Sequence, residues 1–218
     1  MKRNEAELLL KTSLESEKQE RKRIAADLHD SVSSDLSAIR NYLVVLIRSE
    51  LDDEKVELFK ELKDGVETAI ENTRLVSYKL MPPLLENFGF VVALEDYLNR
   101  LNKSGTSKFN LLSKDNRFKF ETSVSYELFR VLQEFTTNML KYGSIKSCTI
   151  TLYIIDKFAY LEIIDDGNSF DFNNEFVNSS GAGVKNISSR LKVIGATLLQ
   201  KEVKNGNHFI IKLPTLQN

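Results

Sequence analysis

The sequence predicts an α+β protein in which a long helical hairpin precedes a sheet that is covered on one face by helices. Three observations support this class. Residues 1–50 contain neither glycine nor proline, and their apolar residues recur every three or four positions, as on one face of a helix. A second stripe of the same period ends at Met81-Pro82-Pro83, where proline stops a helix. From about residue 84 onward, helical segments are interleaved with strand-like runs, which is typical of an α+β domain.

The two stripes predict an antiparallel pair of helices joined near residues 51–54. The first stripe extends back to Leu10 and Leu14, which favours a coiled-coil lead-in. Because each helix of a hairpin has one partner, part of both stripes stays exposed, and we expect two copies to pair as a four-helix bundle in a homodimer. The first stripe comprises Ile24, Leu28, Val32, Leu36, Ile39, Leu43 and Leu46, and the second runs from Val56 to Leu80.

The second part of the chain predicts a separate domain, so we place the hairpin domain at 1–83 and the following domain at 84–218. Amphipathic or glycine-bounded segments predict helices over 91–103, 124–142 and 184–194. Runs rich in aliphatic and aromatic residues predict strands over 108–113, 148–155, 158–164, 197–203 and 208–213, with a turn at Asn205-Gly206.

Composition excludes several classes of function. Thirty basic residues balance 31 acidic ones, so no polyanion partner is expected and direct nucleic-acid binding is disfavoured. The single cysteine, Cys148, forms no internal disulfide, which fits a reducing compartment. With two histidines in the chain, a Cys/His metal cluster is also excluded. The sequence has neither an apolar run of about 20 residues nor a secretory leader, so we expect a cytoplasmic protein or the cytoplasmic part of a membrane-anchored receptor.

The first candidate site is His29, which is followed by Asp30. His29 lies about 100° round the helix from Leu28, beside the apolar stripe, where a neutral imidazole is accessible as a nucleophile. Adjacent helical residues do not face each other, so spacing alone does not establish that Asp30 reaches the ring. Taken alone, the pair is better explained as a solvated surface histidine beside an aspartate.

The second candidate is a polar helix face formed by Glu134, Asn138 and Lys141, with Tyr142 next to it. An amide oxygen can ligate Mg²⁺, a lysine can neutralise phosphate, and an aromatic ring can stack on a base. Taken alone, an ordinary polar helix face explains these residues better.

The third and fourth candidates are Asp165-Asp166-Gly167 after a strand and Gly181-Ala182-Gly183 before a helix. A carboxylate at a strand end can accept a hydrogen bond from the amine of adenine, and glycines at a helix start let backbone N–H groups approach a phosphate. Neither matches a Walker or Rossmann pattern, and each alone could be a turn.

The order of these four clusters resembles a bacterial sensor histidine kinase of the class that is paired with LuxR-type response regulators, the nitrate-sensor-like or HisKA type 3 class. The resemblance covers nearly the whole sequence. The matching segments are 20–30 for the phosphoacceptor helix, 80–90 for the junction between bundle and ATPase domain, 133–142 for the N box, 165–170 for the first glycine box, and 181–187 with Arg190 and Gly195 for the second.

The resemblance implies a role for each candidate residue. His29 would accept the γ-phosphoryl group of ATP, with Asp30 orienting and deprotonating the ring. The C-terminal domain would be an α/β sandwich of the GHKL superfamily, with residues 168–183 as a short lid. Its site would comprise Glu134 as an assistant at the metal, Asn138 as the Mg²⁺ ligand, Lys141 at the phosphates, Tyr142 and Asp165 at adenine, and the glycines Gly167, Gly181 and Gly183.

The resemblance implies a two-component kinase core, a homodimer that autophosphorylates His29 from ATP and Mg²⁺ and passes the group to an aspartate of a LuxR-type response regulator. Membrane association would come only through a sensor region outside this sequence. Ser169 replaces a usual glycine and Asn207 a common threonine, and these motivate the alternative of an inactive phosphotransfer or scaffold dimer with a degenerate ATPase domain. A further alternative is a serine kinase of the anti-sigma type, but such a kinase would not use the helical bundle.

Ser34 stands where relatives with phosphatase activity often carry glutamine, which argues against an efficient phosphatase.

Overall fold

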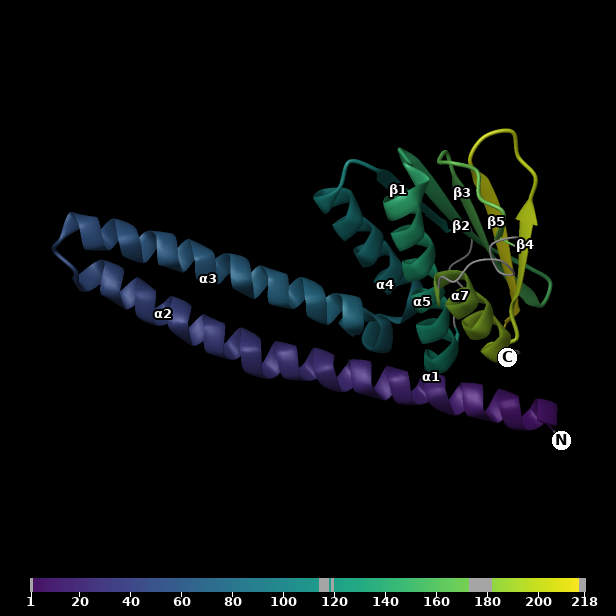
Figure 1. Ribbon diagram of the computed structural model, residues 1–218, viewed down its shortest axis with the longest axis horizontal. Coiled ribbons are helices and arrows are strands. Elements are labelled where there is room, and N and C mark those ends of the chain that lie inside the picture. Colours follow the sequence, from purple (N-terminus) through teal and green to yellow (C-terminus); the bar gives the residue numbers. More distant parts are fainter. Residues whose placement is uncertain (1, 114–117, 119, 173–181, 216–218) are drawn as a thin grey trace. The chain divides into compact units, whose positions relative to one another are not determined.

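The computed structural model describes residues 2–113, 118, 120–172 and 182–215 (Figure 1). The chain divides into two compact units. One is Thr12–Pro83, and the other comprises Leu84–Asn218 with Met1–Lys11. None of the described helices combines the length and apolar character needed to cross a bilayer.

The first unit is a helical hairpin (Figure 1). Its first arm consists of α1 (Lys2–Asp27) from Thr12 onward, the π-helix η1 (Leu28–Val32) and α2 (Ser33–Ser49), which follow one another without a break. The second arm is α3 (Asp53–Leu80). Asp52 caps α3, because its side chain accepts hydrogen bonds from two backbone N–H groups of the first turn. The prediction of one regular α-helix over 1–50 was wrong at η1, where the backbone widens to an i→i+5 hydrogen bond.

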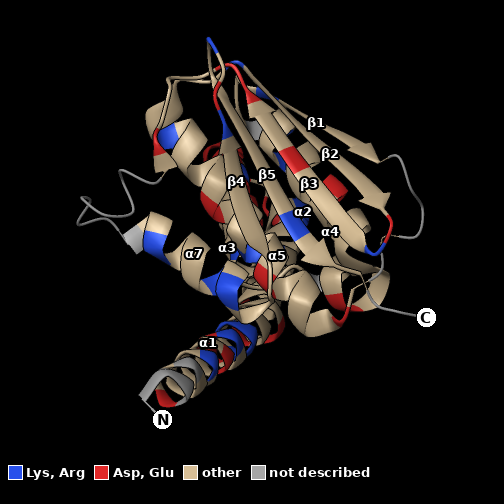
Figure 2. Ribbon diagram, turned by 90° about the vertical axis from the view of Figure 1, so that its right-hand side faces the viewer, with Lys and Arg blue, Asp and Glu red and all other residues tan. Residues whose placement is uncertain are grey.

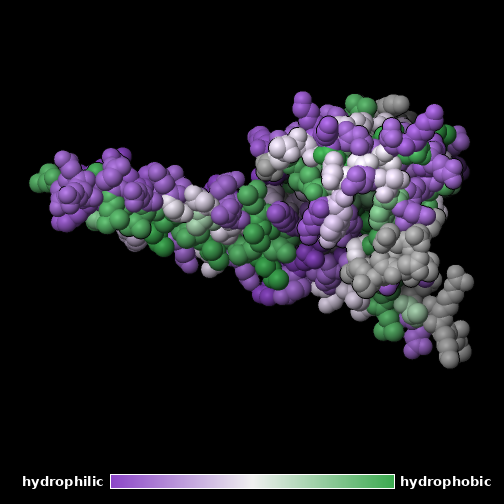
Figure 3. All heavy atoms as spheres, turned by 45° about the horizontal axis from the view of Figure 1, so that its top comes forward, coloured by the Kyte–Doolittle hydropathy of each residue, from purple (hydrophilic) through white to green (hydrophobic). Residues whose placement is uncertain are grey.

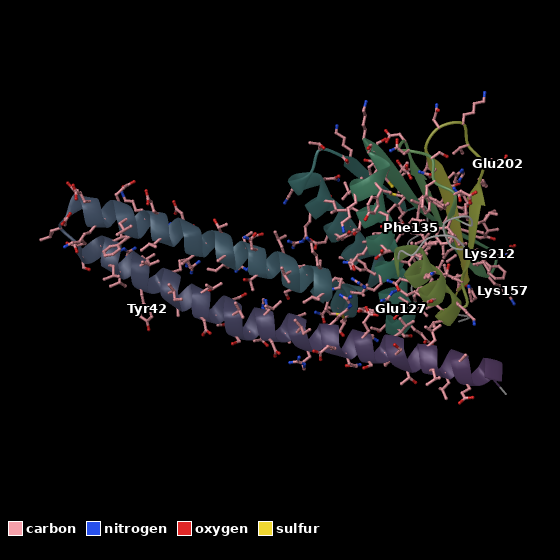
Figure 4. The ribbon with its side chains drawn as sticks, viewed as in Figure 1. Tyr42, Glu127, Phe135, Lys157, Glu202 and Lys212 are labelled. Carbon is pink, nitrogen blue, oxygen red and sulfur yellow. The ribbon has the colours of Figure 1, made fainter. Side chains whose placement is uncertain are left out.

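The two arms pack through a narrow seam. Leu43 and Ile70 are buried, and the buried Ser77 donates a hydrogen bond of 3.0 Å from its Oγ to the carbonyl oxygen of Ala25. Figure 3 shows apolar residues along the hairpin surface, and Tyr42, labelled in Figure 4, is 71% exposed on α2. The hairpin therefore retains an apolar face that its own arms do not cover; its exposed members include Ile39, Tyr42, Val45, Leu46, Leu58 and Leu62.

The second unit begins with α4 (Pro83–Ser104), which starts earlier than the helix predicted over 91–103. Proline suits the first position of a helix, since its missing N–H would have no partner there. Gly89 interrupts α4 with φ +82° and ψ −178°, so the element is two helical pieces joined at a glycine. A positive φ costs glycine little, which explains this residue at the joint.

A five-stranded sheet follows, in the order β1-β2-β3-β5-β4 (Figure 2). β1 runs parallel to β2, and the other neighbours are antiparallel. The predicted strands agree with the observed ones to within two residues, because runs rich in aliphatic and aromatic residues form each of them. The strands are β1 (Lys108–Ser113), β2 (Ser147–Ile155), β3 (Phe158–Asp165), β4 (Thr197–Lys201) and β5 (Asn207–Pro214).

Helices α4, α5 (Thr122–Asn138) and α7 (Ala182–Val193) cover one face of the sheet, as the sequence predicted (Figure 1). The predicted helix 124–142 continues past α5 only as the π-helix η2 (Met139–Gly143). A buried ion pair of 2.7 Å between Glu127 and Arg190 joins α5 to α7. The core residues include Leu94, Leu98, Leu128, Leu132, Ile187 and Leu191 from the helices and Ile150, Leu152, Leu161, Ile163 and Ile211 from the sheet.

Cys148 lies inside this core, on β2. Burial raises the pKa of its thiol to about 12, and the nearby carboxylates of Asp165 and Asp166 act in the same direction.

Candidate active site

The second unit contains a cavity of about 620 Å³ between α5, α7 and the ends of β3 and β5. Its lining comes from segments that are far apart in the sequence, which is typical of a ligand site. The polar lining residues are Glu134, Thr137, Asn138, Lys141, Tyr142, Asp165, Asn168, Ser169 and Asn207.

Asp165 is the buried acid of this cavity, 4% exposed at the end of β3. Its Oδ1 accepts hydrogen bonds from the backbone N–H of Gly167 (2.9 Å) and from Nδ2 of Asn207 (3.1 Å). Its Oδ2 is buried and has no hydrogen-bond partner among the described residues. Burial raises the pKa of this carboxyl, and the bonds from Gly167 and Asn207 partly offset that effect. A buried acceptor without a donor is costly, so this atom is suited to an N–H group of a ligand.

The polar face of α5 meets the start of α7 at a glycine. A Cβ on Gly183 would lie 2.6 Å from Oε1 of Glu134 and 3.3 Å from Nδ2 of Asn138. A larger residue at Gly183 would therefore push into both side chains. The close approach brings the first turn of α7, with its unpaired backbone N–H groups, beside the Glu134 carboxylate and the Asn138 amide.

Lys141 and Tyr142 belong to η2 and are both exposed, at the mouth of the cavity. The π-helix is tied to the segment after β3, because the backbone N–H of Asn168 donates to the carbonyl oxygen of Gly143 (2.7 Å). Gly167 fits this narrow place, since a Cβ there would lie 2.6 Å from the same carbonyl oxygen. Short π-helices are often found at functional sites.

The apolar wall of the cavity consists of aromatic rings. Phe135, which Figure 4 labels on α5, lies 5.0 Å from Phe209 and 6.3 Å from Phe172 between ring centroids. Phe170 meets Phe172 edge to face at 6.3 Å. A wall of this kind is suited to a flat apolar ligand surface.

The other candidate, His29, lies in η1 of the hairpin unit and is exposed, as expected beside the stripe. Asp30 is exposed too, and no hydrogen bond or ion pair joins it to His29 in the described hairpin. The buried Ser33 supports the wide turn, because both its backbone N–H and its Oγ bond to the carbonyl oxygen of Leu28. An exposed imidazole on a supported helix is available to react with a partner group in solution.

Residues 20–85, which include His29, match the sequence model of the histidine kinase family HisKA_3. A curated relative of this chain is the oxygen sensor histidine kinase NreB of Staphylococcus carnosus, which is 22% identical over 207 residues. The match covers 94% of the chain and 59% of the length of that relative.

Solved structures of histidine kinases have a similar fold. The histidine kinase domain of the blue-light activated kinase EL346 from Erythrobacter litoralis gives a TM-score of 0.51 at 12% identity, covering 83% of this chain and 94% of that chain. The histidine kinase AdeS of Acinetobacter baumannii gives 0.50 at 14% identity, covering 88% and 98%. At these identities the likeness concerns the fold alone.

The structure brings most of the predicted pocket residues around one cavity: Glu134, Asn138, Lys141, Tyr142, Asp165 and Gly183. Gly167 lies directly behind Asp165. Gly181 and most of the predicted lid at 168–183 lie outside the described residues, and His29 and Asp30 belong to the other unit.

Sequence reasoning missed the aromatic wall and the bonds made by Asn207, whose amide we expected to weaken a nucleotide contact. Its partners lie 37 to 42 residues earlier in the chain, so no local pattern pointed to them.

Proposed function

We propose that this chain is the core of an ATP-dependent two-component histidine kinase. Residues 84–218 form the catalytic domain that binds ATP and Mg²⁺, and residues 1–83 form the dimerisation and phosphotransfer domain that carries His29. The observation that carries the proposal is the buried Oδ2 of Asp165, which has no hydrogen-bond partner within the described part of the chain and lies in a cavity that also contains Asn138, Glu134 and the glycine start of α7. The match of residues 20–85 to the histidine kinase family HisKA_3 supports the same assignment.

The cavity fits ATP at both ends. The Asp165 carboxylate is an acceptor for the exocyclic amine of adenine, and Phe135, Phe172 and Phe209 form an apolar wall for the ring. At the other end, the first turn of α7 provides backbone N–H groups for phosphate oxygens. Lys141 and Tyr142, at the mouth, add a cation and an aromatic ring.

The oxygen donors also fit Mg²⁺, which prefers one or two protein oxygens plus substrate phosphates and water. Asn138 offers an amide oxygen and Glu134 a carboxylate on the same face of α5. When bound, the metal ion would neutralise charge on the phosphates. Asn138 would hold the metal, and Glu134 would orient water or the metal shell.

The transfer forms a bond between a ring nitrogen of His29 and the γ-phosphorus while the bond from that phosphorus to the β,γ-bridging oxygen breaks and ADP leaves. The neutral imidazole supplies the electron pair, and Asp30 takes the proton from the ring. The phosphoryl group then passes to an aspartate of a LuxR-type response regulator. These events take place in the cytoplasm.

The exposed apolar face of the hairpin supports a homodimer, because apolar area of this extent on a long helical hairpin is stabilised by a second copy. Replacing Tyr42 with lysine is expected to place a charge in the dimer interface and to yield monomers at concentrations where the wild type is dimeric. Sedimentation velocity measures this. Asn41→Lys is the matched control on the neighbouring exposed position; equal dimerisation of the two variants would contradict this interface.

Affinity for ATP is expected to depend on pH through Asp165. Burial raises the pKa of this carboxyl above its ordinary value of 3.8, so protonation on acidification removes the acceptor for the amine and ATP binds more weakly. Folding responds in the opposite sense: the raised pKa favours the protonated folded state, so this contribution to stability is present below pH 3.8 and is lost as the pH rises through the raised value.

Titration calorimetry and thermal unfolding over this pH range measure the two effects. In each case the wild type is compared with Asp165→Asn. The effect of protonation of ATP itself on binding is the same for both proteins and therefore cancels in the comparison. A pH profile that is the same in both proteins would rule out Asp165 as the titrating group.

The test of the proposed function is incubation of the protein with γ-labelled ATP and Mg²⁺. Phosphohistidine is labile in acid and stable in base, and that pattern is the expected result. ATP binding without label would favour the inactive scaffold. Asn207 in place of threonine was one reason for the inactive-scaffold alternative. That reason is weakened, because Asn207 donates a hydrogen bond to Asp165. Label that survives acid would indicate a serine kinase.

A further inference from the structure

The segment 168–172, which follows the Asp165 turn, is held by two side-chain amides. Asn207, at the start of β5, donates from Nδ2 to the carbonyl oxygen of Asn168 (2.9 Å) and accepts the backbone N–H of Phe170 at Oδ1 (2.8 Å). Gln200, on β4, accepts the backbone N–H of Phe172 at Oε1 (2.9 Å) and donates from Nε2 to the carbonyl oxygen of Phe170.

These side-chain hydrogen bonds take the place of the backbone hydrogen bonds that a neighbouring strand would make. Backbone N–H and C=O groups of a segment beside a sheet usually pair with backbone, and here they pair with side chains from β4 and β5. Asn207 is 6% exposed, and both ends of its amide are used. Its Nδ2 makes a further bond of 3.1 Å to Oδ1 of Asp165, so one buried amide joins the pocket acid to the segment after it.

These hydrogen bonds determine which carboxylate oxygen and which aromatic rings line the pocket. Because Gly167 and Asn207 both donate to Oδ1 of Asp165, the bare acceptor is Oδ2. Because Phe170 and Phe172 are tied through their backbone groups, their rings stay on the aromatic wall beside Phe209.

We propose that Asn207 is a positioning residue of the nucleotide pocket, which with Gln200 fixes the segment 168–172 and orients the Asp165 carboxylate toward the base. This inference rests on the proposed function and adds to it. The segment 168–172 is held by two amides from the neighbouring strands β4 and β5.

The first measurement is hydrogen exchange of backbone amides without nucleotide. Asn207→Leu removes the acceptor for the Phe170 N–H, so exchange at that amide is expected to become at least tenfold faster. Gln200→Leu is expected to do the same for the Phe172 N–H and to leave the bond between Asn207 and Asp165 in place. Unchanged exchange at both amides would overturn the clamp, and this result does not depend on whether ATP binds.

The second measurement is phosphorylation kinetics. Asn207→Leu is expected to raise the KM for ATP about tenfold, the scale of one hydrogen bond to a charged group, while kcat at saturating ATP changes less than twofold. Gln200→Leu is expected to raise KM less. If both variants lose kcat to the same extent while their KM for ATP stays at the wild-type value, a positioning role of Asn207 at the base is wrong.

Thermal unfolding of each variant controls for misfolding. A third variant, Asn207→Asp, keeps an acceptor for Phe170, loses both donations from Nδ2 and places a second carboxylate against Oδ1 of Asp165, so it is expected to protect the Phe170 amide and still to raise KM. If Asn207→Asp binds ATP as the wild type does, the role of Asn207 toward Asp165 is wrong. If the wild type itself binds no ATP while exchange changes as expected, the proposed function fails and the clamp stands.

Discussion

Replacement of His29 with glutamine is expected to reduce incorporation of phosphate from ATP to background while ATP affinity stays within about twofold of the wild type. The reason lies in the position of the residue. His29 is an exposed side chain in η1, so the substitution leaves the hairpin core unchanged. Glutamine preserves size and polarity and lacks the ring nitrogen that would carry the phosphoryl group.

The chain supplies a matched control for this experiment, because it has two histidines. His208 lies on β5, where its Nε2 is 2.7 Å from Oε1 of Glu162, and His208→Gln is expected to retain the acid-labile label. If the label persists in His29→Gln and disappears in His208→Gln, our proposal has assigned the phosphoryl group to the wrong histidine. ATP binding by both variants, measured by calorimetry, separates loss of the acceptor from loss of the pocket.

Replacement of Gly206 with alanine is expected to destabilise the second unit by about 3 kcal/mol, which corresponds to a fall in melting temperature of about 10 °C. Gly206 precedes Asn207 and has φ +74°. A Cβ there would lie 1.9 Å from the carbonyl oxygen of Asp165. Such contact with backbone forces β3 and β5 apart at the place where Asp165 and Asn207 pair in register. ATP affinity is therefore expected to fall as well.

Two other glycines separate the causes of this effect. Gly195 also has a positive φ, +65°, with open space around its Cβ position, so Gly195→Ala is expected to cost about 1 kcal/mol from backbone strain alone. Gly65 lies within α3 with open space, and Gly65→Ala is expected to stabilise the hairpin by about 0.5–1 kcal/mol. Thermal unfolding of the three variants measures the series. Equal losses for Gly206→Ala and Gly195→Ala would contradict a steric origin.

Local patterns predicted the fold where a pattern has a physical cause in neighbouring residues. Met81-Pro82-Pro83 ends α3 because proline cannot continue a helix, and alternating burial defines β2 and β3. The π-helices at Leu28–Val32 and Met139–Gly143 left no such pattern, because one wide turn changes the spacing of apolar residues too little to be recognised. The early start of α4 was missed because the break at Gly89 divides its stripe.

In the candidate site too, local patterns predicted only what depends on neighbouring residues. Asp165 and Gly167 were found because a carboxylate and a glycine at a strand end form a recognisable turn, and the structure joins them by a hydrogen bond. Asn207 was assigned a weaker contact, since its effect depends on partners that only the pairing of β3 with β5 brings near. Spacing did not establish contact between His29 and Asp30, and that role stays a proposal.

The single cysteine of the chain has a practical consequence. Alkylating reagents react with the thiolate, and Cys148 is buried with its thiol pKa raised to about 12, so it is nearly inert at neutral pH. A cysteine introduced at an exposed position, such as Ser34 on α2, would be the one reactive thiol in an otherwise natural sequence. Fluorophores or spin labels could then be attached site by site, and the distance between the hairpin and the second unit measured with and without ATP.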